Sequence, residues 1–83
     1  MEAGVIIEKV KEALAIRLNI PKERVNPESY LTEDLGMDSF AAIEVIFELE
    51  EKFNISIPEN DIAKVKKVQD IIDYINKRVT SAP

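Results

Sequence analysis

The chain has 83 residues, of which 46% are hydrophobic and 33% are charged, a composition typical of one small folded domain. It contains no cysteine and no histidine, which excludes disulfides, a thiol nucleophile and the general base most common at neutral pH. The first apolar run stops at Glu8, so the sequence predicts neither a signal peptide nor a membrane span, and therefore a cytoplasmic protein.

The acidic residues are concentrated in the middle of the chain. Residues 33–51 contain seven acids and no base, whereas the other residues contain nine acids and eleven bases. The two parts therefore carry net charges of −7 and +2. This segregation argues against nucleic acid as a partner and favours proteins with basic surfaces.

The first predicted element is an amphipathic helix over residues 3–18. Apolar residues recur on one face at helical spacing and are expected to be buried: Ile6, Ile7, Val10, Ala13, Leu14 and Leu18. The polar face mixes acidic and basic residues, which favours a helix packed in a core over a helix bound to a membrane.

Residues 19–37 show no sustained period, and Pro21 and Pro27 exclude a long helix there. A connection of this length is uncommon in a compact domain and is often functional. Residues 21–24 are predicted to form one helical turn. Five spaced apolar residues are expected to attach the connection to the core: Ile20, Val25, Tyr30, Leu31 and Leu35. The connection should therefore be ordered.

The connection ends in the sequence Asp-Leu-Gly-Met-Asp-Ser-Phe at residues 34–40. Gly36 permits a turn with positive φ, and Asp38 and Ser39 are good residues with which to open a helix. Ser39 is thus predicted at a helix N-terminus, where free N–H groups and a partial positive charge would favour a phosphate on its hydroxyl. Taken alone, Ser39 would be interpreted as a capping residue.

The helix predicted over residues 38–52 has three kinds of surface. One face is expected in the core: Ala42, Val45, Ile46, Leu49 and Phe53. The opposite face is expected in solvent: Glu44, Glu48 and Glu51. A second apolar strip lies between them: Phe40, Ile43 and Phe47. We expect Phe47 at least to be partly exposed, while exposure of the other two and cover by the loop or the next helix both stay open. An exposed aromatic residue among carboxylates is typical of a docking patch.

Two other functions of this helix are disfavoured. Neighbouring carboxylates such as Glu44 and Glu48 could serve as an acid and base pair, but nothing predicts a cleft that would raise a pKa. A calcium loop starting at Asp34 would have Ser39 where glycine is required and Val45 where glutamate is required.

The last third of the chain predicts two more helices. Residues 54–58 alternate like a strand but have no partner strand, so we expect an extended connection. A short helix is predicted over residues 59–64, with Ile62 buried. The last helix is expected to bury Val68, Ile71, Ile72, Ile75 and Val79, and residues 80–83 should fray. The prediction is one all-α domain over residues 1–83, ordered over about 3–78: a small bundle of three principal helices plus one short helix.

Four segments resemble the acyl carrier proteins in their order and spacing. They are Leu35–Ser39, Leu49–Phe53, Ile57–Pro58 and Val68–Ile75, which match that family's LGxDS, LEExF, IP and VxDxxxYI elements. The resemblance extends over about residues 5–78 and implies the small bundle of that family.

The resemblance also implies a cofactor and its sites. Ser39 would carry 4′-phosphopantetheine, taken from coenzyme A, and Asp38 would assist the enzyme that attaches it. The residues assigned to partner binding are Phe40, Ile43, Glu44, Phe47, Glu48, Glu50 and Glu51. Part of the core would open to shelter the acyl chain, and it would be lined by Ile46, Leu49, Ile62 and Ile72.

The implied function is that of a carrier and not of an enzyme. Acyl intermediates would be held as thioesters on the arm and presented to enzymes of fatty-acid, lipid or polyketide-type synthesis. The implied partners are holo-acyl-carrier-protein synthase or another phosphopantetheinyl transferase, together with acyl-transferring, condensing and reducing enzymes. The carrier is expected to be a monomer and to need no metal.

Three residues depart from the family pattern. Phe40 replaces the usual leucine, Ala41 stands where many fatty-acid carriers have an acid, and Phe47 is bulkier than the common residue. These departures favour a dedicated pathway, such as a specialised lipid, over bulk fatty-acid synthesis. Three lysines form either a basic patch or ordinary solvated surface: Lys64, Lys66 and Lys67.

Two alternatives come from other classes of function. One is an unmodified helical interaction module that binds a partner through helix 38–52. The other is a hydrolase built on Ser39, which is disfavoured because the chain has no histidine to activate the hydroxyl.

Overall fold

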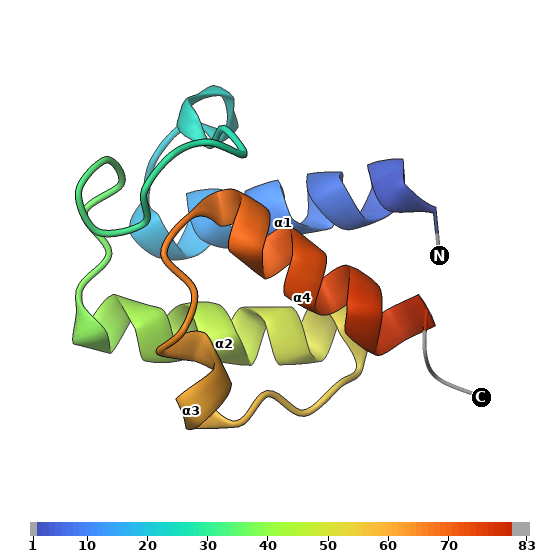
Figure 1. Ribbon diagram of the computed structural model, residues 1–83. Coiled ribbons are helices and arrows are strands. Elements are labelled where there is room, and N and C mark those ends of the chain that lie inside the picture. Colours follow the sequence, from blue (N-terminus) through green and yellow to red (C-terminus); the bar gives the residue numbers. More distant parts are fainter. Residues whose placement is uncertain (1, 81–83) are drawn as a thin grey trace.

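The computed structural model describes residues 2–80. Of the residues expected to fray, Thr80 is instead the last residue of the last helix, and residues 81–83 lie outside the described residues. The elements are α1 (Ala3–Leu18), a 3₁₀ turn η1 (Lys22–Arg24), α2 (Ser39–Phe53), α3 (Glu59–Ile62) and α4 (Val68–Thr80). The predicted all-α bundle of three principal helices and one short helix is confirmed (Figure 1). Among the helices of this described part, none combines the length and apolar character needed to cross a bilayer.

The three long helices share one core. α1 and α2 run antiparallel, and α4 packs against α1, while α3 lies at the edge of the bundle (Figure 1). The buried residues of the helices are Ile6, Val10, Ala13 and Leu14 of α1, Val45, Ile46, Leu49 and Phe53 of α2, and Val68, Ile71, Ile72 and Ile75 of α4. These are the apolar stripes of each helix, which lose contact with water when the helices pack.

The buried stripes differ from the predicted ones at their edges. Ile7 and Leu18 are only half-buried, because the buried row of α1 runs along the seam between α2 and α4. Ile62 and Val79 are also half-buried, since α3 lies at the edge and Val79 is near the end of α4.

Polar caps set the ends of the helices. α2 begins one residue later than predicted, because Asp38 is its N-cap and its Oδ1 accepts a hydrogen bond of 2.8 Å from the Ala41 N–H. Asn19 and Asn54 end α1 and α2 in the left-handed conformation, with φ of 56° and 55°. At the start of α4 the carboxylate of Asp70 accepts hydrogen bonds from the N–H groups of two preceding lysines, Lys66 and Lys67.

The connection between α1 and α2 is ordered, as predicted. Val25, Leu31 and Leu35 are buried, but Tyr30 is 40% exposed and does not serve as the predicted anchor. Its ring instead faces the solvent side, with the Lys67 ammonium 5.0 Å from the ring centroid. The neighbouring Leu31, at the start of the turn over residues 31–35, is buried in its place.

Main-chain hydrogen bonds tie this connection to the segment that joins α3 and α4. The Leu31 N–H donates to the Lys66 carbonyl at 2.8 Å, the Val68 N–H to Ser29 at 3.0 Å, and the Gln69 N–H to Pro27 at 2.8 Å. Tyr30 and Lys67 thereby form an isolated antiparallel bridge. The loop that leads to Ser39 is thus attached to α4 through the backbone.

Candidate functional site

Ser39 is the first residue of α2 and is exposed. The chain reaches it through a turn in which Gly36 has a φ of 73°, a conformation that favours glycine. Leu35 and Met37, on either side of that turn, are buried, and the Met37 N–H donates to the Leu31 carbonyl at 2.9 Å. Two apolar anchors and the main-chain bonds of the turn, that of Met37 among them, therefore fix the backbone just before Ser39.

The Ser39 hydroxyl does not cap the helix. Asp38 accepts the capping hydrogen bond, so the serine oxygen is left at the exposed tip of α2. The N-terminus of a helix carries a partial positive charge, and a phosphate on Ser39 Oγ would be stabilised there.

An open groove of about 660 Å³ begins at Ser39 and runs between the start of α2 and α3. Besides Ser39 it is lined by apolar and polar residues: Met37, Ala42, Ile43, Ile46, Ile62, Ala63 and Val65, with Thr32, Asp38, Glu59 and Asn60. A long flexible group attached to Ser39 has room to lie in this groove, so the residues present fit a phosphopantetheine arm.

The second apolar strip of α2 is exposed to solvent. The exposed fractions are 72% for Phe40, 41% for Ile43 and 61% for Phe47. The expected exposure of Phe47 is confirmed, and the open question about the other two is answered, because the long loop and α3 leave both of them uncovered. Exposed apolar surface of this kind commonly marks an interaction site.

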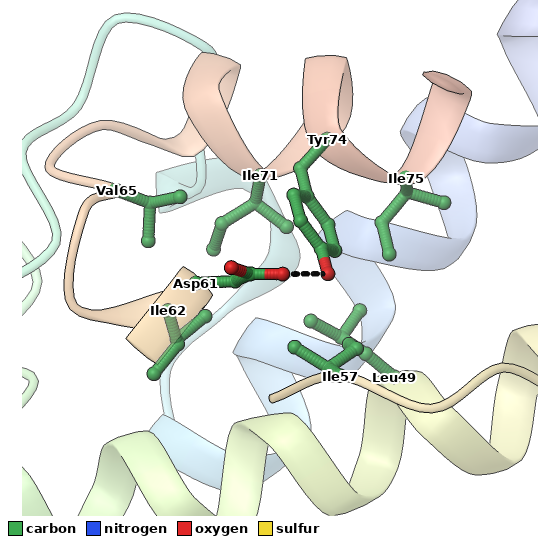
Figure 2. A pocket seen from close by; sticks show the side chains of 8 residues that line it. All are labelled: Leu49, Ile57, Asp61, Ile62, Val65, Ile71, Tyr74 and Ile75. Carbon is green, nitrogen blue, oxygen red and sulfur yellow. Dashed lines mark hydrogen bonds between the residues drawn. The ribbon is translucent and has the colours of Figure 1, made fainter. Parts of the chain in front are cut away.

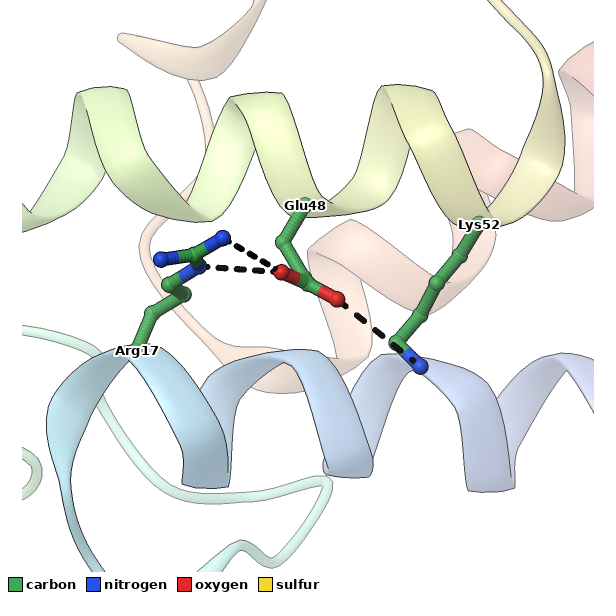
Figure 3. A network of polar contacts seen from close by, with 3 residues as sticks. All are labelled: Arg17, Glu48 and Lys52. Carbon is green, nitrogen blue, oxygen red and sulfur yellow. Dashed lines mark hydrogen bonds and ion pairs between the residues drawn. The ribbon is translucent and has the colours of Figure 1, made fainter.

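The position of Glu48 differs from the expectation that it faces solvent. Its side chain is only 16% exposed, and its Oε1 accepts from Arg17 Nε at 2.9 Å, across the seam between α1 and α2 (Figure 3). Lys52 Nζ lies 3.9 Å from the other carboxylate oxygen. Periodicity placed Glu48 opposite the core stripe, but α1 packs over that side of α2. Glu51 is exposed and Glu44 is half-buried.

Glu50 has a role inside the fold that the sequence did not indicate. Its Oε2 accepts a hydrogen bond of 2.8 Å from the Ile57 N–H, and its carbonyl accepts from the Ile55 N–H at 3.2 Å. Glu50 therefore holds the connection between α2 and α3 against the end of α2. Ile57 lies beyond the end of α2, so no helical period relates it to Glu50 and the sequence carried no signal for this contact.

Comparison with known proteins agrees with this geometry. The family model described as "Phosphopantetheine attachment site" matches residues 8–75. An acyl carrier protein of Thermosynechococcus vestitus is 42% identical over 81 residues, which are 98% of this chain and 100% of that protein. An acyl carrier protein of Chlorobium phaeobacteroides is 40% identical over 78 residues, which are 94% of this chain and 100% of that protein. This chain belongs to the acyl carrier protein family.

Membership of the acyl carrier family accounts for the chemistry that the chain lacks. The family is built around a covalently attached 4′-phosphopantetheine, and its members are carriers and not enzymes. The cofactor supplies the thiol that a sequence without cysteine cannot provide. Residues 2–80 bring together no group of acidic side chains that could hold a metal ion.

The acyl carrier fold also has a small apolar cavity between α2, α3 and α4 (Figure 2). Its volume is about 10 Å³, and it is lined by Leu49, Ile57, Asp61, Ile62, Val65, Ile71, Tyr74 and Ile75. Of the residues expected to line an acyl-chain cavity, Leu49 and Ile62 lie here. Ile46 lines the groove beside Ser39 instead, and Ile72 is buried but lines neither space.

Two polar residues of this cavity were not singled out by the sequence. The Tyr74 hydroxyl donates a hydrogen bond of 2.6 Å to Asp61 Oδ2 and accepts one of 2.6 Å from Arg78 Nη1. Burial and the hydrogen bond to Asp61 raise the pKa of the Tyr74 phenol, so it keeps its proton and acts as the donor.

Proposed function

We propose that Ser39 is the residue of this carrier that bears 4′-phosphopantetheine. The observation that supports the proposal most directly is that Ser39 is exposed at the first position of α2 while Asp38 makes the capping bond. The first-turn N–H groups favour the negative phosphate, and the adjoining groove leaves room for the arm. When bound, the arm supplies a thiol that holds acyl groups as thioesters.

We also propose that partner enzymes dock on the apolar strip of Phe40, Ile43 and Phe47 beside Ser39. The strip is exposed, and residues 33–51 around it carry a net charge of −7. Fitting partners have a basic surface with an apolar pocket: a phosphopantetheinyl transferase and the acyl-transferring, condensing and reducing enzymes of fatty-acid, lipid or polyketide-type synthesis.

The two exposed phenylalanines support a dedicated set of partners. A pocket that accepts the rings of Phe40 and Phe47 would be larger than one built for smaller residues, and Ala41 offers no charge to a basic partner. We therefore infer a specialised lipid or polyketide-type pathway. We further propose that the carrier acts as a monomer in the cytoplasm, where coenzyme A is supplied.

The attachment site is tested by intact mass after incubation with coenzyme A and a phosphopantetheinyl transferase of broad specificity. The arm should add roughly 340 Da to the protein. Ser39→Ala should gain nothing, whereas the control Ser56→Ala, which alters another exposed serine, should gain the full mass. The same gain on Ser39→Ala would overturn the site.

The alternative of an unmodified interaction module makes the opposite prediction in the same experiment. It requires a protein that stays at its apo mass with every transferase supplied, while still binding a partner through α2. The exposed strip of α2 would serve such a module as well, but the exposed serine at the helix tip would have no role in it.

A further inference from the structure

α3 forms one wall of the cavity between α2 and α4. All four residues of α3 are exposed or half-buried, in contrast to the buried stripes of α2 and α4 on the other walls. It has a single turn, closed by main-chain bonds of 3.0 Å from the Asp61 N–H to the Pro58 carbonyl and 3.3 Å from the Ala63 N–H to the Glu59 carbonyl. Of the walls, α3 has the least buried surface to lose by moving.

The cavity is too small for an acyl chain as it stands. About 10 Å³ is roughly the space of one water molecule, so a chain of several methylene groups enters only if a wall moves outward. The lining is aliphatic except for Asp61 and Tyr74, which stand on α3 and α4 and face each other (Figure 2). Movement of α3 away from α4 therefore separates these two side chains.

The contact between them is a short, charge-assisted hydrogen bond. Tyr74 donates its one hydroxyl proton to Asp61 at 2.6 Å, because the Arg78 guanidinium donates to the hydroxyl from the other side, also at 2.6 Å. The guanidinium also lies over the Tyr74 ring, with Cζ 5.6 Å from its centroid. Arg78 thus orients the phenol so that its proton points to α3.

We propose that the hydrogen bond between Tyr74 and Asp61 is a latch on the cavity, which sets the shortest acyl chain that this carrier shelters. This hydrogen bond holds the cavity closed in the unloaded protein and must break when an acyl chain enters. This inference rests on the proposed function, because the chain must be attached through Ser39 beside the groove that leads toward α3.

The two opposing effects can be compared as equilibrium factors. Each methylene group that leaves water favours the filled state roughly fourfold. A hydrogen bond to a charged acceptor at a half-buried site favours the closed state by about tenfold. The latch therefore offsets the burial of about two methylene groups, so it lengthens the shortest chain that enters the bundle by about two methylene groups.

The test compares Tyr74→Phe with Tyr30→Phe, which removes the other tyrosine hydroxyl of the chain from an exposed ring outside the cavity. Each protein is loaded with a homologous series of saturated acyl groups, and the rate of thioester cleavage by hydroxylamine is measured against chain length. Tyr74→Phe should protect chains about two methylene groups shorter than the parent protein does. Tyr30→Phe should keep the parent threshold.

Hydrogen exchange on the unloaded proteins gives a readout that does not depend on Ser39. The amides of residues 59–65 should exchange about tenfold faster in Tyr74→Phe, while those of α1 keep the parent rate. Should Tyr74→Phe unfold, Asp61→Asn replaces it, since a neutral acceptor weakens the same bond and should lower the threshold by a smaller amount.

The failures are distinguishable. If Ser39 takes up no phosphopantetheine arm, the proposed function is wrong, and the hydrogen-exchange experiment still tests the latch. If the arm loads and both tyrosine variants keep the parent threshold, the latch is wrong and the carrier assignment stands. A general loss of protection across all helices of Tyr74→Phe would show a structural role of the hydroxyl and would also overturn the latch.

Discussion

Arg17 of α1 and Glu48 of α2 are joined by a forked ion pair, in which Nε and Nη2 lie 2.9 Å and 2.8 Å from the same carboxylate oxygen (Figure 3). This pair removes Glu48 from the free acidic surface of α2, although the helical period places it there. The carboxylates of α2 that lie apart from such a pair and are best placed to meet a basic partner are Glu44 and Glu51.

The ion pair leads to a prediction about stability. Glu48→Gln removes the charge but keeps the size of the side chain, and it should lower the free energy of unfolding by about 0.5–1 kcal/mol, because the pair is only partly exposed. Urea unfolding measures the change. Glu51→Gln is the matched control: it should leave stability within about 0.5 kcal/mol and slow association with a basic transferase roughly twofold at low salt. Equal slowing of association by Glu48→Gln and Glu51→Gln would contradict the distinction between a paired Glu48 and an available Glu51.

The cap at the start of α2 gives a second prediction. Asp38→Ala should lower the free energy of unfolding by about 1 kcal/mol, since the Ala41 N–H loses its acceptor, whereas Asp38→Asn should stay within about 0.5 kcal/mol of the parent. If Asp38→Asn is stable but takes up the phosphopantetheine arm more slowly, the carboxylate acts in the modification reaction itself. A large loss of stability in Asp38→Asn would show that charge, and not capping, is the contribution of Asp38.

The exposed strip predicts a separation between docking and folding. Phe47→Ala should change the free energy of unfolding by less than about 0.5 kcal/mol, because the ring is 61% exposed, and it should raise the KM of the transferase for the carrier. Phe53→Ala, six residues along the same helix, should cost about 3–5 kcal/mol because that ring is in the core. An unchanged KM for Phe47→Ala would remove the strip from the docking surface.

The two glycines of the chain predict opposite effects of the same substitution. Gly36→Ala should destabilise the protein by about 1–2 kcal/mol, because its φ of 73° strains a residue with a Cβ although no neighbouring atom is close. Gly4→Ala should stabilise it by about 0.5 kcal/mol, because Gly4 is helical and an added Cβ meets open space. Thermal unfolding of both variants tests the pair, and a loss of stability in both would contradict it.

A fifth prediction concerns pH. Hydrogen bonds from the main-chain N–H groups of Lys66 and Lys67 hold the pKa of Asp70 below its ordinary value of 3.8. A lowered carboxyl pKa contributes stability that is fully present above the ordinary value and is lost as the pH falls through the folded value. The difference in unfolding free energy between the parent and Asp70→Asn should therefore be constant near neutral pH and shrink below about pH 4. A difference that is the same down to about pH 2 would show that the charge of Asp70 contributes nothing.

Periodicity was a good guide to the helices and to the stretch that presents Ser39. The ends of α1 were predicted correctly because its apolar period stops at Leu18, and the start of α2 was wrong by one residue because Asp38 caps the helix that Ser39 opens. Exposure of Phe47 also followed from the helical wheel, since one packing surface cannot cover two apolar strips.

No periodic pattern in the sequence indicated the contacts between distant segments. Arg17 lies 31 residues from Glu48, and Tyr74 lies 13 residues from Asp61, so neither pair shares a helix on which a period could reveal it. Ile71 and Ile72 are both buried in α4, and only the position of α3 decides that Ile71 and not Ile72 lines the cavity.

The loop before Ser39 is attached to the start of α4 by main-chain hydrogen bonds between residues 27–31 and residues 66–69, beside the side-chain contact of the Lys67 ammonium with the Tyr30 ring. Substitution of a side chain leaves the peptide groups in place. The position of Ser39 should therefore be kept when residues of either segment are substituted. Substitution by proline should weaken this attachment, because proline at Leu31 or Val68 removes a main-chain N–H donor. Surface lysines and glutamates of these segments can therefore diverge to suit new partners while the serine stays where it is.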